Sequence, residues 1–229
     1  MKYPPRTIAL ICELFHPPLE PSPVHVQRVH NDLFQTPDPA YKSFAVSPNG
    51  AVLSNPVTRP GEVSTAAFLP DRFQFREELT GLTVDEFAAR VRDISEQVAR
   101  LAGVQVFTAQ QVTVRTLVNP RHFKDSRQYL KEGMFGFSDQ TEAFGRTPEL
   151  YGLRLVFPPT PEVPNAHALR IESFSSDPRS LYLENQASFA PVLLARGLDV
   201  LADNVQEAYA FLVERSLAFV ARFDVSPQA

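Results

Sequence analysis

The chain has 229 residues, of which 44% are hydrophobic and 21% charged, and its formal net charge is −4. An acidic globular chain is a poor match for generic nucleic-acid binding, which depends on Lys and Arg neutralising phosphates. Cys12 is the only cysteine, which excludes an intrachain disulfide and a cysteine-rich zinc site, and no apolar run is long enough to span a membrane. We therefore expect a cytoplasmic protein with no membrane partner.

The first elements are a buried strand and a short helix. Residues 8–15 are almost continuously apolar and precede a proline-rich connector at 17–23, where each proline removes a backbone donor and so ends the strand. Ser22 then supplies an N-cap and Pro23 a first helical residue. This pattern predicts an amphipathic helix that ends before Pro37.

Two hairpins and a long helix are predicted next. The turn residues at 47–50 and 70–71 each separate two short β segments, which are 43–46 and 51–54 in the first hairpin, then 64–69 and 72–76 in the second. Thr83 and Glu86 form a capping box, and the apolar stripe that follows ends at Gly103. A helix over 84–102 is therefore expected.

The element pattern then restarts. Strands are predicted at 104–118, 150–157, 168–174 and 181–189, and Asp203 is predicted to cap a last helix that ends near Phe223. Each half thus contains a strand, a helix or insertion, several strands and a long helix. We predict an α+β fold with antiparallel sheet covered by two long helices. The two similar halves, 1–103 and 104–229 with an insertion at 119–149, share one core in an order of the tandem TATA-binding-protein or ferredoxin type.

Residues 63–119 carry a resemblance to a known family. They contain a strand, the turn from Leu69 to Phe73, a capped helix beginning near Glu86 and a strand that ends in the run from Arg115 to Asn119. This arrangement resembles a sporadically distributed bacterial family of unknown function, whose members also end in a strand, a loop and an amphipathic helix, as residues 181–223 do. The resemblance implies the fold outline and a bacterial cytoplasmic setting, and it assigns no catalytic residue.

Candidate catalytic and metal-binding side chains are few. His25 and His30 are five residues apart on one helix, which places them roughly 140° apart, so they cannot share a metal ion. His16 has Glu13 and Glu20 nearby, but it lies at the start of a proline-rich connector. Since the sequence also lacks a G-x-S-x-G elbow and a glycine-rich phosphate loop, we expect no catalytic residue, no metal site and no cofactor.

The insertion at 119–149 is rich in aromatic side chains, and its acidic and basic residues balance. Long loops in a compact domain are usually functional or disordered, and aromatic residues argue against simple disorder. Three interpretations remain open, which are a flap packed on the sheet, a ligand lid or partner surface, and a crossover to a second subunit. The aromatic residues assigned to a ligand or partner surface are Phe123, Tyr129, Phe135 and Phe137.

Three arginines alternate with apolar residues in predicted strands. Arg115, Arg154 and Arg170 each point away from the apolar side, so neighbouring strands would place them on one sheet face together with Glu172 and Glu184. A solvated face with cross-strand ion pairs explains this pattern, and a shallow site for an anionic ligand is the alternative.

The sequence favours a non-enzymatic binding or assembly module with a protein partner or self-association as a homodimer. An anionic small ligand is a further expected partner, and generic nucleic acid is not. One alternative is an RNA endonuclease of the tandem-ferredoxin kind found in CRISPR systems, with His25 or His30 as general acid or base. The other is a small-molecule pocket between the sheet and the long helix.

Overall fold

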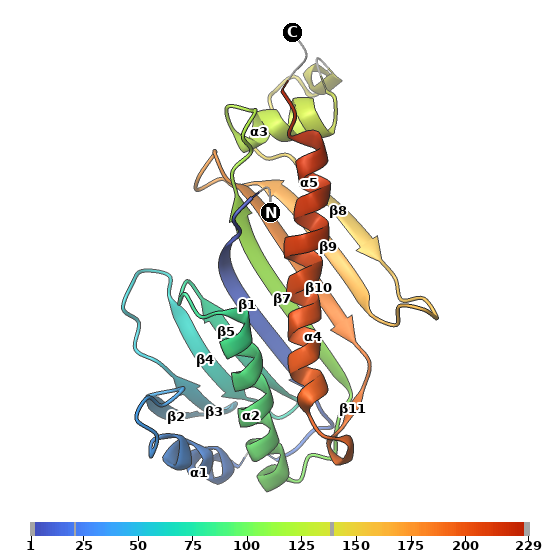
Figure 1. Cartoon of the computed structure of the whole chain (residues 1–229). Coiled ribbons are helices and arrows are strands. Elements are labelled where there is room, and N and C mark those ends of the chain that lie inside the picture. Colours follow the sequence, from blue (N-terminus) through green and yellow to red (C-terminus); the bar gives the residue numbers. More distant parts are fainter. Residues whose placement is uncertain (1–2, 21, 138–139, 227–229) are drawn as a thin grey trace.

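One nine-stranded antiparallel sheet organises the molecule (Figure 1). The computed structural model describes residues 3–20, 22–137 and 140–226. The strand order is β2-β3-β4-β5-β1-β7-β10-β9-β8. The strands are β1 (Arg6–Phe15), β2 (Ser43–Ser47), β3 (Gly50–Ser54), β4 (Val63–Phe68), β5 (Arg72–Glu78), β7 (Ala109–Val118), β8 (Gly152–Phe157), β9 (Ala166–Ser173) and β10 (Leu181–Phe189). Two short strands, β6 (Val106–Phe107) and β11 (Val192–Leu193), pair separately.

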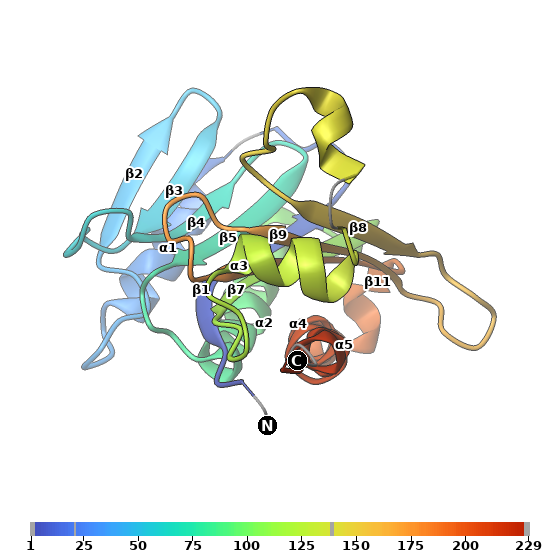
Figure 2. The same ribbon diagram turned by 90° about the horizontal axis from the view of Figure 1, so that it is seen from above.

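The longer helices cover one face of this sheet (Figure 2). They are α1 (Pro23–Leu33), α2 (Val84–Ala102) and α4 (Asp199–Ala210), the last of which continues through a π-helical segment (Phe211–Ser216) into α5 (Leu217–Phe223). Shorter helical segments are α3 (Ser126–Gln128), a π-helical segment (Tyr129–Met134), and two 3₁₀ turns (Gln140–Phe144 and Leu194–Arg196). None of the described helices combines the length and the hydropathy needed to cross a bilayer.

Side chains alternate between the two faces of each strand, and this alternation determines which of them contact the helices. In β7, every second side chain is buried, from Gln110 to Val118, and the intervening ones are half-exposed. A single cluster of buried apolar side chains joins both parts of the chain, since it contains Phe75 of β5 and Ile94 of α2 as well as Leu201 of α4. The mixed α+β fold with a large antiparallel sheet is therefore confirmed.

The two halves of the chain meet at the centre of the sheet. The first strand of each half, β1 and β7, pair with each other, and each also pairs with the last sheet strand of its own half, β5 or β10. The long helix that follows each of these last strands, α2 or α4, crosses the same face, and the two helices contact each other. The core thus continues across the junction without a gap between the halves.

Several predicted boundaries hold and two are wrong. The Thr83–Glu86 capping box is present, Gly103 ends α2 in the left-handed region at φ 74°, and β10 has the predicted limits. The last helix begins at Asp199 and not after Asp203, because a helical turn closed by the Leu201 N–H donating to the Leu198 carbonyl (3.0 Å) precedes that position. The predicted strand at 104–118 is divided at Thr108, whose N–H donates to the carbonyl of Phe15 at 2.7 Å.

Candidate functional site

The sheet face opposite the long helices is largely uncovered. Apart from the turn Gln140–Phe144 near one end, the described part of the chain places no helix on it (Figure 2). One row of side chains crosses this face over all nine strands in direct register, and most of its members are small or polar. The row consists of Val156, Ala168, Gln186, Thr113, Ile11, Arg76, Thr65, Ser54 and Ser43.

The three arginines predicted to share a face lie in the adjacent row. Arg154 of β8 is opposite Arg170 of β9, which is opposite Glu184 of β10, which is opposite Arg115 of β7. Arg115 Nε donates to Glu184 Oε2 at 2.7 Å, and Arg170 Nη2 is 3.3 Å from Glu184 Oε1. Tyr182 also donates its hydroxyl to Glu184, at 2.8 Å. The expected juxtaposition on one face is therefore present, with Glu184 at its centre.

The surroundings of Glu184 keep it charged. Its partial burial favours the neutral acid, but the hydrogen bonds from Arg115 and Tyr182 outweigh burial and lower the pKa of Glu184 below its ordinary value. Burial and the hydrogen bond to Glu184 raise the pKa of Tyr182 to about 12, so its hydroxyl stays protonated and remains a donor. Four groups thus hold one another in fixed positions on an otherwise open surface.

The other half of the face carries a second group of ion pairs. Arg72 lies 3.2 Å from Glu13 and 2.9 Å from Asp71, and Arg76 pairs with Glu78. Positive and negative groups are therefore interspersed over the whole face. Such a surface does not present the continuous basic path that a nucleic-acid backbone requires.

Arg154 is the exception to this pairing. It is exposed on the edge strand β8 and makes no ion pair within the described ranges of the chain. Its cross-strand neighbour is Arg170, a group of like charge. Of the three predicted arginines, Arg154 is therefore the one with a guanidinium free for a partner.

The predicted aromatic residues divide into two groups. Phe123 is 9% exposed and Tyr129 is fully buried, with its hydroxyl donating to the Val220 carbonyl of α5 at 2.7 Å. Phe135 is partly buried against the core, and Phe137 is 37% exposed. Tyr129 is therefore enclosed by the core, whereas Phe123 lines a cavity of about 320 Å³ beside Arg222 and Phe223 at the end of α5.

Asp224 ties this part of the insertion to both ends of the described chain. Its carboxylate accepts hydrogen bonds from the backbone N–H groups of Arg121 (2.8 Å) and His122 (2.9 Å), and from the hydroxyl of Tyr3. Burial would raise the pKa of Asp224, but these hydrogen bonds lower it below its ordinary value. The sequence offered no signal for this contact, since its partners lie more than 100 residues apart in the chain.

His16 and His30 occupy packed positions. The ring of His30 lies 5.4 Å from that of Phe34 and 6.0 Å from that of Phe44. His16 is 4% exposed and lines a cavity of about 220 Å³ together with Glu20 and His25. Within the part of the chain that the structure describes, no three His, Cys, Asp or Glu side chains are grouped to hold a metal ion.

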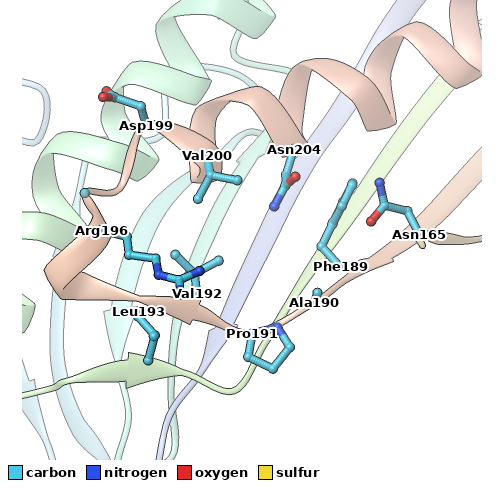
Figure 3. A pocket seen from close by; sticks show the side chains of 11 residues that line it. Asn165, Phe189, Ala190, Pro191, Val192, Leu193, Arg196, Asp199, Val200 and Asn204 are labelled. Atoms are coloured by element: carbon cyan, nitrogen blue, oxygen red, sulfur yellow. The ribbon is translucent and has the colours of Figure 1, made fainter. Parts of the chain in front are cut away.

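A surface pocket of about 400 Å³ lies where β10, β11 and the start of α4 meet (Figure 3). Arg196 extends towards Val192 on one side, and the amide of Asn204 points in from α4. Asn204 already donates to Gln110 at 2.7 Å, and Gln110 in turn donates to the Leu201 carbonyl at 3.0 Å. The sequence did not indicate this pocket, because Arg196 and Gly197 lie in a short turn without a recognisable motif.

No model of a known protein family matches the chain, and no curated protein sequence is significantly similar to it.

Proposed function

We propose that the protein is a non-enzymatic binding module that holds a protein partner on the uncovered face of its sheet. The single observation that carries this proposal is the face itself, which crosses nine strands and has most of its charged groups fixed in ion pairs. Side chains held in place before binding lose little conformational entropy when a partner docks. Interspersed charges of both signs suit a protein surface better than a polyanion.

The proposal includes the finer features expected from the sequence. One of these is a tandem arrangement of the two halves, of the TATA-binding-protein or ferredoxin type, and the pairing of β1 with β7 supports it. Membership of the bacterial family of unknown function and a cytoplasmic setting belong to the same proposal.

A steric block on the face tests this function. Gln186 is exposed on β10, two strands from the central strand β1, so Gln186→Trp adds a large side chain to the face without disturbing the core. Ala218 is exposed on α5, on the covered side, and Ala218→Trp is the matched control. Tagged wild-type protein and both variants are used to capture proteins from a lysate of the source organism, followed by quantitative mass spectrometry.

We expect the wild type and Ala218→Trp to retain the same specific partner and Gln186→Trp to lose it. Equal capture by all three proteins would place the binding surface elsewhere. Capture by none of them would contradict the proposed function.

A second candidate is small-molecule binding in the pocket of Figure 3. It is favoured by Arg196, which makes no ion pair in the described ranges and lies beside apolar and amide groups of the lining. The lining also contains Asp199, whose carboxylate lies 3.4 Å from Arg92. This composition suits a small organic anion. Thermal unfolding with and without a panel of carboxylate and phosphate compounds tests it, and Arg196→Gln is expected to abolish any stabilisation that the wild type shows.

A further inference from the structure

The edge strand β8 presents a row of unpaired backbone groups. The Ser173 N–H donates to the Tyr151 carbonyl at 2.9 Å, and hydrogen-bonded pairs alternate along an antiparallel ladder. Counting from this pair, the N–H and C=O groups of Gly152, Arg154 and Val156 point away from β9. They face outward because β8 is the last strand of the sheet.

This edge has little of the usual protection against pairing with another strand. Natural edges are commonly shielded by charged side chains, especially lysine, by proline, by bulges or by a covering segment, and Arg154 is the single charged residue of β8. The six residues of β8 contain neither lysine nor proline, and their register with β9 is regular. Val156 is 64% exposed and Leu150, just before the strand, is 50% exposed. A second strand placed here would cover apolar surface as well as satisfy the backbone.

Two oppositely charged side chains lie near this edge, Arg154 on β8 and Glu172 on β9, in neighbouring cross-strand pairs of the same face. Among the residues that the structure describes, Arg154 has no acidic partner, whereas Glu172 lies opposite Gly152 on the same face. A Cβ atom at Gly152 would come within 2.6 Å of Glu172 Cγ, so the side chain of Glu172 lies across the glycine, next to the edge. A guanidinium that approached Gly152 from outside would meet this carboxylate.

We infer that two copies of the chain pair through β8, antiparallel about a twofold axis at Leu153. This register places Gly152 opposite Arg154 of the partner subunit and Leu150 opposite Val156 of the partner subunit. Each Arg154 then reaches the other copy's carboxylate across a glycine, and the exposed apolar residues cover each other. The twofold operation makes the contact closed, as in most homodimers, and joins the two sheets into one.

Neighbouring registers fit less well. An axis at Arg154 would place the two Arg154 side chains directly opposite each other, and like charges in this position are destabilising. An axis at Leu155 would place Arg154 opposite Val156 and leave the arginine without an acidic partner. The inference goes beyond the proposed function, because it places a second copy of the chain at the β8 edge and not on the uncovered face.

Sedimentation velocity of the full chain over a concentration series measures the association. We expect a concentration-dependent dimer for the wild type and a monomer for Val156→Lys, a substitution that leaves the core intact because Val156 is 64% exposed. The matched control is Val46→Lys on the opposite edge strand β2, where Val46 is 60% exposed and the association is expected to persist. A monomeric wild type, or equal loss in both variants, would overturn the inference, and masses beyond a dimer would indicate open pairing of β8 with β2.

Exchanging the charges at positions 154 and 172 tests the contact between Arg154 and the partner's Glu172. Arg154→Glu is expected to weaken the dimer by about tenfold or more, since it opposes two carboxylates. The double variant Arg154→Glu, Glu172→Arg is expected to recover most of the loss. A double variant as weak as the single one would contradict this contact.

Cysteine cross-linking tests the register. Cys12 is fully buried and burial raises the pKa of its thiol to about 12, so it does not compete. The variant with Leu150→Cys and Val156→Cys is expected to form a covalent dimer on oxidation. Efficient disulfide formation between two molecules of the Arg154→Cys variant would instead support the axis at Arg154 and overturn the register.

Failure of the dimer and failure of the proposed function give different results. If the wild type is monomeric but Gln186→Trp still loses a captured protein, the β8 pairing is wrong and the binding function stands. If the chain dimerises through β8 but Gln186→Trp captures the same proteins as the wild type, the pairing stands and the uncovered face is not the binding surface.

Discussion

Glu184 shows how a single carboxylate organises a polar surface. It lies between Arg115 and Arg170 and also accepts the hydroxyl of Tyr182, and only 18% of its side chain is exposed. Each of these three neighbours forms an ion pair or a hydrogen bond with the Glu184 carboxylate. Removing the carboxylate therefore leaves two guanidinium groups next to each other without their common partner.

We expect Glu184→Gln to lower the free energy of unfolding by about 1–3 kcal/mol at neutral pH, because hydrogen bonds to a charged, partly buried group are lost. Urea denaturation measures this change. The control is Glu172→Gln, which removes a more exposed carboxylate 3.7 Å from Arg170 and is expected to cost less than about 1 kcal/mol. Equal costs for the two variants would contradict the central role of Glu184.

The same carboxylate gives stability a pH dependence of defined sign. The folded protein lowers the pKa of Glu184, so the unfolded chain binds the proton more readily. The contribution is fully present above the ordinary glutamate pKa of about 4.3 and is lost as the pH falls through the lowered value. Denaturation curves between pH 6 and pH 3 are therefore expected to converge for the wild type and Glu184→Gln, and a constant difference would contradict this linkage.

Residue patterns predicted part of this surface. Strict alternation within each strand placed the three arginines on the polar side, which requires only local sequence. The strand order decides which of them are neighbours, and no local pattern contains that information. For Phe123 and Tyr129, the local sequence does not predict burial, because an aromatic ring in a long insertion is equally compatible with a buried position and a surface one.

The insertion acts as a structural element in its first part. The π-helical segment Tyr129–Met134 packs on the end of α5, and Ser126 donates to the Pro178 carbonyl at 2.9 Å from its hydroxyl. A deletion through this segment would remove core residues. We therefore expect such a deletion to destabilise the fold.

We expect Tyr129→Phe to cost about 1–2 kcal/mol through the lost hydrogen bond to Val220, and Tyr129→Ala about 3–5 kcal/mol through the additional cavity. Phe137→Ala is the control from the same insertion, and its loss is expected to stay below about 1 kcal/mol because the ring is 37% exposed. Chemical denaturation distinguishes these values. A small effect of Tyr129→Ala would mean that the segment detaches without consequence for the core.

Helix α2 illustrates an element that local sequence determines almost completely. The hydroxyl of Thr83 accepts from the Glu86 N–H at 3.3 Å, while Glu86 accepts from the Thr83 N–H at 2.9 Å. Both contacts lie within four residues, so the sequence signature is sufficient. The start of α4 has no such signature, since Leu198 provides no side-chain cap, and the cap was predicted five residues too late, at Asp203.

We expect Thr83→Ala to reduce stability by about 1 kcal/mol, as for other N-cap substitutions. Thr83→Ser keeps the hydroxyl and is expected to stay near the wild type. Thermal or urea unfolding measures both variants, and equal losses would show that the cap does not act through its hydroxyl.

At the scale of the whole molecule, the balance of charge bears on whether the protein binds nucleic acid. The net charge is acidic, and on the uncovered face Arg72, Arg76, Arg115 and Arg170 are already paired with carboxylates. We expect no appreciable binding of duplex DNA or single-stranded RNA at physiological salt, measured by fluorescence anisotropy. Tight binding that weakens steeply with salt would contradict this expectation, and loss of an RNA cleavage activity in His25→Ala or His30→Ala would support the endonuclease alternative.

The position of β1 has a consequence for the kinetics of folding. β1 is the central strand, yet its partners are distant in sequence, because Ala9 pairs with Glu78 in β5 and with Arg115 in β7. Closing such long loops before any contact is formed makes folding slow, so β1 remains an unpaired apolar strand until much of the chain is available. Cys12 lies in this strand, and its thiol is reactive only while the strand is open. Pulsed thiol labelling during refolding should therefore report the moment at which the centre of the sheet closes, and we expect protection of Cys12 to appear together with the slowest folding phase.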